Sequence, residues 1–135
     1  MKVKIKRLYD SAKLPQYATE GAGAMDLFAC VNRPEKIFPG QVQIIGTGIA
    51  VEVPFGYGLF ISPRSGLYLK HGVFVATSPA LIDNSQKGRE IKIILKNEGV
   101  DPFYINPDAK IAECFICELP DVEWIEEKWE RESNG

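Results

Sequence analysis

Glycine and proline interrupt this sequence at short intervals, and no other feature limits its possible folds as strongly. The 135 residues contain 12 Gly and 9 Pro. Before residue 121, no window of about 11 residues both lacks Gly and Pro and spaces its apolar residues by three and four, as a helix requires. The runs between the interruptions are short and rich in Val, Ile, Phe and Tyr. This composition is typical of many short β-strands.

Five stretches show the pattern of individual strands. Charged and apolar residues alternate over residues 2–8, which predicts an edge or half-buried strand, and the same period of two extends over 41–53. Further strands are predicted over 56–61, 91–95 and 111–119, of which 91–95 is the most apolar and the most deeply buried. A chain of 15.0 kDa is one domain. We expect an all-β fold, a sandwich, barrel or jelly roll of about eight or more short strands.

The chain lacks the patterns of secretion, membrane insertion and duplex binding. The N-terminus alternates charged and apolar residues where a signal peptide would be apolar, and no apolar run approaches the roughly 20 residues that span a bilayer. The net charge is −2 and no basic block is present, which argues against direct nucleic-acid binding. Cys30, Cys114 and Cys117 cannot all pair, which favours a reducing compartment. We therefore expect a cytoplasmic protein with no membrane partner.

The last residues differ from the rest of the chain in charge. Residues 121–135 hold six acidic and two basic side chains, a charge of −4, so the remaining body carries +2. Val122, Ile125 and Trp129 are spaced as i, i+3 and i+7, so this tail either forms a short amphipathic helix or docks as an extended arm. A weakly positive body suits a small anionic ligand, whereas an acidic arm is a poor lid for phosphates. We therefore do not expect the arm to close over such a ligand.

Three short motifs place reactive groups where turns are expected. Arg64, Ser65 and Gly66 bring together a guanidinium, a hydroxyl and an accessible backbone amide, which are donors for phosphate or carboxylate oxygens; a plain turn with a surface arginine is the alternative. Asp83 follows the apolar pair Leu81-Ile82, and it either caps its own turn or serves as a general base or hydrogen-bond acceptor. Asp26 lies among small residues, and a turn before a strand is its simpler interpretation.

Neither histidine nor cysteine supports a metal or nucleophile site. His71 is the only histidine, so a site built from several histidines is excluded, and packing or a surface hydrogen bond is its expected role. Cys114 and Cys117 form a Cys-x-x-Cys pair, but they lie in a predicted strand and no second pair exists. We predict that both are core or near-core thiols and not zinc ligands or redox groups.

In order and spacing, the motifs resemble those of the trimeric deoxyuridine triphosphate nucleotidohydrolases, or dUTPases. The first motif corresponds to residues 14–27 and the second to 63–67 with 70–72. The third corresponds to 78–83 with Gly88 and Glu90, and the fourth to 110–113. The resemblance therefore implies a dUTPase-like β domain over 1–120, followed by the acidic C-terminal arm over 121–135.

The resemblance implies a distorted jelly roll, or β-clip barrel, assembled as a homotrimer with active sites at subunit interfaces. It implies hydrolysis of dUTP to dUMP and pyrophosphate, which keeps uracil out of DNA and supplies dUMP, with Mg²⁺ held mainly by the triphosphate. Asp83 is then the catalytic carboxylate that orients the attacking water, and Asp26 contacts the metal through water. The phosphates are bound by Arg64, Ser65 and Gly66 of a neighbouring subunit, and the uracil and sugar are framed by Thr77, Leu81, Ile82 and Lys92.

Three departures from the family pattern all concern substrate handling. Gln86 replaces a tyrosine whose ring lies under the deoxyribose, and the segment 84–89 is one residue longer than usual. Glu113 replaces a glutamine, and a carboxylate beside a triphosphate is repelled unless it is protonated or binds a cation. The Gly-rich closing motif of the family is absent from 121–135, and with the trimer that the resemblance implies, the acidic arm is expected to lie across a neighbouring subunit. Gln86 and Glu113 are expected substrate contacts. The departures leave two alternatives open: a catalytically weak nucleotide-binding or regulatory protein, and a pyrophosphohydrolase with altered dNTP specificity.

Overall fold

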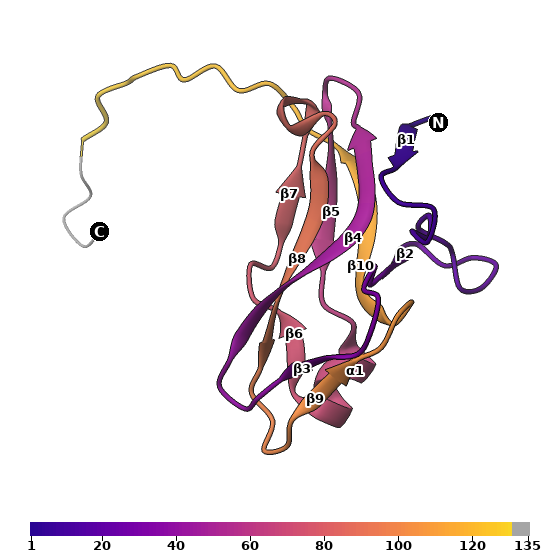
Figure 1. Ribbon diagram of the computed structural model, residues 1–135. Helices are drawn as coiled ribbons and strands as arrows, with labels where there is room; N and C mark the ends of the chain where they lie inside the picture. Colours follow the sequence, from indigo (N-terminus) through magenta and orange to yellow (C-terminus); the bar gives the residue numbers. More distant parts are fainter. Residues whose placement is uncertain (131–135) are drawn as a thin grey trace.

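A computed structural model describes residues 1–130 (Figure 1). Within these residues, ten strands form two four-stranded sheets and one two-stranded sheet, and all pairs are antiparallel. The first sheet has the order β1 (Lys4–Arg7), β4 (Val42–Glu52), β8 (Glu90–Asn97), β6 (Val73–Val75). The second has the order β2 (Met25–Phe28), β10 (Lys110–Glu118), β5 (Tyr57–Ser62), β7 (Ala80–Ile82), and the third pairs β3 (Glu35–Ile37) with β9 (Phe103–Ile105).

One apolar core joins the two four-stranded sheets. Alternate residues of β8, namely Ile91, Ile93 and Leu95, are at most 1% exposed, as expected when successive side chains of a strand point to opposite faces. From the second sheet, Leu27 and Ile61 belong to the same buried cluster. Each of these side chains stabilises the fold by about 1.5–3 kcal/mol through its removal from water. The expectation of a mainly β fold is confirmed.

The five predicted strands are all present, as β1, β4, β5, β8 and β10. The sequence pattern did not predict the other five strands. Each of these has only three or four residues, which is too short for a period of two to stand out.

The structure also contains a helix that the sequence pattern missed. α1 (Ser65–His71) lies within the motif for which a turn was the alternative, and with seven residues it is shorter than the window in which a helical period is recognised. Its C-terminal end did carry signals: Lys70 and His71 lie in its last turn, and Gly72 follows with a φ of 71° and donates its N–H to the Tyr68 carbonyl. The prediction that no helix forms before residue 121 was wrong here.

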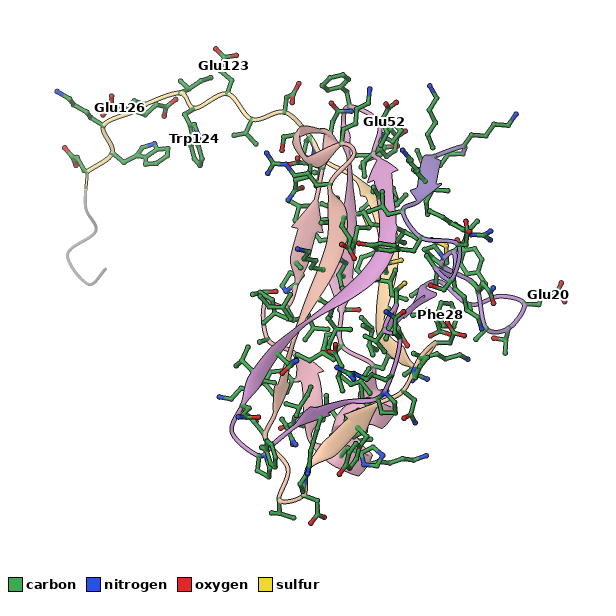
Figure 2. The ribbon with its side chains drawn as sticks, viewed as in Figure 1. Glu20, Phe28, Glu52, Glu123, Trp124 and Glu126 are labelled. Atoms are coloured by element: carbon green, nitrogen blue, oxygen red, sulfur yellow. The ribbon has the colours of Figure 1, made fainter. Side chains whose placement is uncertain are left out.

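Residues 121–130 leave the body as an irregular, extended segment (Figures 1 and 2). Every residue in this segment is exposed, and Trp124 is 90% exposed. The amphipathic-helix alternative was therefore wrong for 121–130, and the extended arm remains. The rest of the predicted arm, 131–135, lies outside the described residues. No helix in the described part of the chain has the length and apolar character to cross a membrane.

The histidine and the thiols behave mainly as structural side chains. The exposed ring of His71 packs against Phe103 with 4.9 Å between the ring centroids, as predicted for a packing role. Cys114 is buried, and this burial, reinforced by the Asp26 and Glu113 carboxylates, raises the pKa of its thiol to about 12. The thiol is therefore protonated and unreactive at neutral pH. Cys117 is exposed, so the prediction of a near-core position was wrong for it.

Candidate active site

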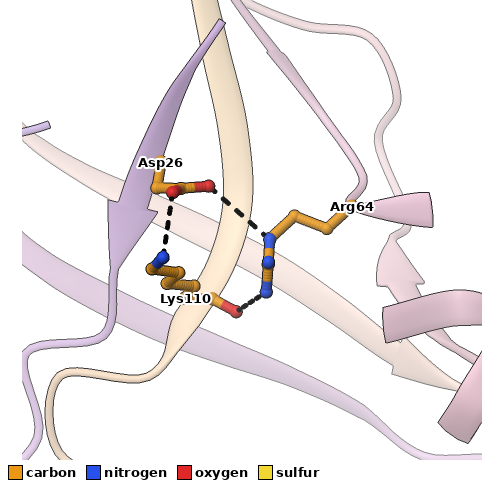
Figure 3. A network of polar contacts seen from close by, with 3 residues as sticks. All are labelled: Asp26, Arg64 and Lys110. Atoms are coloured by element: carbon orange, nitrogen blue, oxygen red, sulfur yellow. Dashed lines mark hydrogen bonds and ion pairs between the residues drawn. The ribbon is translucent and has the colours of Figure 1, made fainter. Parts of the chain in front are cut away.

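Three charged residues from three motifs meet at one end of the second sheet (Figure 3). Asp26 lies in β2, Lys110 begins β10, and Arg64 stands between β5 and α1. Arg64 Nε lies 3.6 Å from Asp26 Oδ1, and Lys110 Nζ lies 3.4 Å from Asp26 Oδ2. Arg64 also donates from Nη1 to the Lys110 carbonyl at 3.2 Å. The three residues form one network, which we call the Asp26 network.

Burial makes the Asp26 network a fixed anchor for Arg64. The Asp26 side chain is 8% exposed, and a carboxylate in that position is costly unless cations pair with it. The Arg64 side chain is 33% exposed, so part of it is within reach of a ligand. Ser65 and Gly66 follow in the exposed first turn of α1. Arg64, Ser65 and Gly66 therefore form a compact set of groups, and their binding of phosphate stays a prediction.

Glu113 occupies the row of the sheet that contains Asp26. In β10 it pairs with Asp26 of β2 on one side and with Ser62 of β5 on the other. Residues directly opposite in antiparallel strands point to the same face. Glu113 is partly buried, and its side chain therefore lies on the same face as that of Asp26. Its partner in β5, Ser62, comes two residues before Arg64.

The other predicted substrate contacts are spread along β7, β8 and the turns beside them, with Asp83 and Gln86 at the end of the sheets opposite Arg64. Asp83 directly follows β7, which contains Leu81 and Ile82, and Gln86 ends the short 3₁₀ turn η1 (Asn84–Gln86). Thr77 lies in the exposed connection from β6 to β7, where the Ala76 N–H bonds to the Ile94 carbonyl of β8. The exposed Lys92 lies further along β8.

Within a single chain, Asp83 lies far from Arg64. The β5–β7 register pairs Leu59 with Ile82, so one further step places Asp83 opposite Gly58. Arg64 lies six residues beyond Gly58, which corresponds to about 20 Å along a strand. Figure 1 shows α1 and the η1 turn at opposite ends of the molecule. The structure therefore does not bring Asp83 and Arg64 of one copy together.

A family comparison covers almost the whole chain. The family model described as dUTPase matches residues 10–134. The chain belongs to the dUTPase family. It is similar to the deoxyuridine 5′-triphosphate nucleotidohydrolase of Rickettsia akari, with 45% identity over 92% of this chain and 84% of that one. It is also similar to the enzyme of that name from Chlamydia caviae, with 43% identity over 87% of this chain and 80% of the other.

Solved dUTPase structures share the fold. A mutant dUTPase from phage phi11 of S. aureus, studied for the coordination of a structural Mg(II) ion, superposes with a TM-score of 0.81 at 20% identity and covers 95% of this chain and 99% of its own. A mutant dUTPase of Staphylococcus bacteriophage 80alpha with dUpNHpp gives a TM-score of 0.80 at 19% identity, covering 94% and 97% of the two chains. At this identity the likeness supports the dUTPase fold alone.

Within this dUTPase-family chain, sequence reasoning overlooked two contributors to the site. Lys110 opened the fourth motif without being given a role, yet it is the second cation on Asp26; because the pair joins residues far apart in sequence, no local signal could reveal it. Ser85 donates to the Asp83 carboxylate from both its N–H and its hydroxyl. The pattern Asp83-x-x-Gln86 is a capping-box signature that could have revealed this turn.

The donor set for a metal ion is sparse. Residues 1–130 contain no group of three or more His, Cys, Asp or Glu side chains that could hold a metal ion. Asp26, the expected metal contact, already faces Arg64 and Lys110. Hard divalent cations such as Mg²⁺ accept few protein ligands when phosphate oxygens and waters complete their coordination. These residues therefore fit a metal ion that arrives with a phosphate ligand better than one held by the protein alone.

Proposed function

We propose that this chain is a cytoplasmic dUTP diphosphatase, which hydrolyses dUTP to dUMP and pyrophosphate. Its fold is then a distorted jelly roll of the β-clip type, and it works as a homotrimer. The observation that carries the proposal is the placement of Asp83 at one end of β5 and of the Arg64 donor set at the other. In this proposal each end supplies one half of a site, and a neighbouring copy supplies the other half.

The proposed chemistry needs positioning and charge neutralisation more than covalent catalysis. Water attack on a triphosphate is helped by donors aimed at the phosphate oxygens and by one group that orients the nucleophile. Asp83 accepts a hydrogen bond from the attacking water. Arg64, Ser65 and Gly66 of a neighbouring subunit donate to the phosphate oxygens, and the Asp26 network keeps the Arg64 guanidinium in place.

The nucleoside half of the substrate is assigned to the segment around β7. Thr77, Leu81, Ile82 and Lys92 frame the uracil and the sugar in this proposal. Gln86 stands where a tyrosine ring is usual, but its side-chain carbonyl accepts the Asp83 N–H, so no ring lies under the sugar to exclude a 2′-hydroxyl. We therefore expect discrimination between dUTP and UTP to be weaker than with a tyrosine at this position.

Magnesium is the proposed cofactor. Mg²⁺ would arrive with the triphosphate; Asp26 would hold it through water, and Glu113 would be a further acidic group on the same face. When bound, the ion supplies positive charge that offsets the charge of the phosphates.

The trimer also gives the exposed tail a place to bind. Trp124, Ile125 and Trp129 are 90%, 75% and 81% exposed on the acidic arm. The body has an apolar groove of about 450 Å³ where the edge strands β1 and β2 separate, lined by residues that include Ile5, Leu14, Tyr17, Met25 and Ile116. Lysines alternate along β1 beside this groove, which complements the acidic arm. We propose that the arm of one subunit lies in the groove of its neighbour.

The assay for the function is pyrophosphate release from dUTP, dTTP, dCTP and UTP with Mg²⁺. The wild-type protein should turn over dUTP fastest, and an Asp83→Asn variant should be slower by about 10²- to 10⁴-fold. Binding of the non-hydrolysable analogue dUpNHpp without any turnover would favour the nucleotide-binding regulator instead. Rapid turnover of dTTP or dCTP in place of dUTP would identify altered base specificity.

The assembly is tested by truncation. A chain ending at residue 120 lacks the arm. Its trimer should therefore dissociate toward monomer at a higher protein concentration than the trimer of the full chain does. Sedimentation velocity across a concentration series measures this. A truncated chain that stays trimeric at every concentration at which the full chain does would contradict the arm contact.

A further inference from the structure

The turn after β7 fixes the Asp83 carboxylate through hydrogen bonds that come from within the turn itself. Asp83 adopts an extended backbone, with φ −125° and ψ −172°, and forms the N-cap of η1. Its Oδ1 accepts the Ser85 N–H at 3.0 Å and also the Ser85 hydroxyl. In return, the Asp83 N–H donates to Gln86 Oε1 at 2.8 Å. This reciprocal pair is a complete capping box.

The capping box makes the two carboxylate oxygens of Asp83 unequal. Oδ1 carries two hydrogen bonds from Ser85, whereas within residues 1–130 no protein hydrogen bond or ion pair reaches Oδ2. A carboxylate with one oxygen held cannot rotate freely about its Cβ–Cγ bond. Oδ2 is therefore presented in one direction, as a preorganised acceptor requires.

The whole turn is fastened to the end of β4, so the cap has a rigid base. Asn84 Nδ2 donates to the Val53 carbonyl at 2.8 Å, and the Gly88 N–H donates to the Val51 carbonyl at 3.4 Å. Lys87 Nζ lies 2.7 Å from Glu52 Oε1, and Figure 2 labels Glu52 at this end of β4. These contacts tie both sides of the turn to a strand of the core sheet.

We propose that Gln86 and Ser85 are positioning residues, which hold Asp83 so that Oδ2 is the oxygen that meets the attacking water. This inference rests on the proposed function and deepens it. Gln86 acts through its side-chain carbonyl on the Asp83 backbone, so its contribution is to the rate of the chemical step and not mainly to nucleotide affinity. Ser85 acts on the carboxylate directly.

The test removes the acceptor on residue 86 and then restores it. Gln86→Ala should lower kcat about 10- to 100-fold, since small misplacements of a catalytic group are costly, with KM changed by no more than about twofold. Gln86→Glu keeps an acceptor at the same reach and should recover most of kcat. Ser85→Ala should lower kcat in the same way, and Ser85→Thr, which keeps the hydroxyl, should recover it.

The chain offers a matched control for the loss of a glutamine cap. Gln41 Oε1 accepts the Phe38 N–H at 3.0 Å, with the same three-residue spacing, in a turn between β3 and β4. Gln41→Ala removes the same kind of contact far from Asp83, and kcat should not change. Thermal denaturation of all variants separates loss of rate from loss of folded protein.

Two readouts keep this inference separate from the proposed function. Absence of dUTP turnover by the wild-type protein overturns the function, whereas wild-type turnover with an unchanged kcat in Gln86→Ala overturns the positioning role. Failure of Gln86→Glu to recover kcat, or a loss confined to KM, also overturns it. Hydrogen exchange of the Asp83 amide checks the cap without any substrate: exchange about tenfold faster in Gln86→Ala supports the contact, and unchanged exchange overturns it.

Discussion

The two ends of β5 hold their functional groups in opposite ways. At the α1 end, the Asp26 network joins residues 26, 64 and 110 through ion pairs. At the other end, Asp83 is held by hydrogen bonds from Ser85 and Gln86 within one short turn. The first arrangement is long-range and charged, and the second is local and largely uncharged.

This difference suits the roles proposed for the two ends, which are phosphate binding at Arg64 and orientation of water at Asp83. A phosphate-binding guanidinium must keep its charge and its direction, which a buried counter-charge supplies. A carboxylate that orients water must keep one oxygen free, and hydrogen bonds to the other oxygen supply that without a neutralising cation. In the proposed enzyme, each end is therefore fixed in the way that preserves its reactive atom.

The largest expected effect tests whether the two ends meet through another copy. Arg64→Ala and Asp83→Asn should each lower turnover by about 10²- to 10⁴-fold, because each removes one half of every site. Mixing the two variants, unfolding them and refolding them together should restore activity. With random assembly of equal amounts, about a quarter of the sites combine an intact Asp83 with an intact Arg64 from the neighbour.

The control for this mixing experiment is each variant refolded alone, which should remain inactive. An Arg64→Ala, Asp83→Asn double variant refolded with either single variant should also give no recovery, since no intact pair can form. If the mixture of single variants stays inactive while both refold as trimers, the site does not cross the subunit interface.

A smaller effect is expected from the buried carboxylate of the Asp26 network. Asp26→Asn leaves Arg64 and Lys110 without their shared counter-charge and should cost about 1–2 kcal/mol of unfolding free energy, discounted because both cations are partly exposed. Turnover should also fall about tenfold as Arg64 loses its anchor. Urea denaturation and kcat/KM measure the two effects.

Glu98→Gln is the matched control for Asp26→Asn. It breaks the exposed Lys96–Glu98 pair, whose side chains are 39% and 45% exposed, and it should cost less than about 1 kcal/mol. Equal losses of stability in the two variants would show that burial of the Asp26 network contributes nothing.

The contrast between the long-range Asp26 network and the local Asp83 turn also explains which parts of the two ends the sequence could predict. The strands with long alternating patterns were predicted, and the motifs singled out Asp83 and Arg64 as candidate site residues. The Asp83 turn was within reach, because its Asp-x-x-Gln pattern is local. The partnership of Lys110 with Asp26 was not, because it depends on the β2–β10 pairing, which connects residues more than eighty positions apart. Short α1 was missed because seven residues cannot display a helical period.

The smallest expected effect comes from the ion pair that fastens the Asp83 turn to β4. Lys87 lowers the pKa of Glu52 below its ordinary value of 4.5, first through its hydrogen bond and then through its charge. Because the folded-state pKa is depressed, this pair stabilises the protein above the ordinary pKa, and the contribution is lost as the pH falls through the folded value. Lys87→Met should therefore be slightly less stable than wild type at neutral pH.

The difference between Lys87→Met and wild type should shrink as the pH falls from neutral through the lowered pKa of Glu52, because a protonated Glu52 carries no charge to pair with Lys87. Urea midpoints across a pH series from neutral downward measure it, and an NMR titration of Glu52 should show its pKa returning upward in the variant. The value of kcat should stay within about twofold of wild type, because the Asn84 and Gly88 hydrogen bonds and the capping box remain. A loss of kcat as large as that of Gln86→Ala would mean that the Lys87–Glu52 ion pair, and not the capping box, positions Asp83.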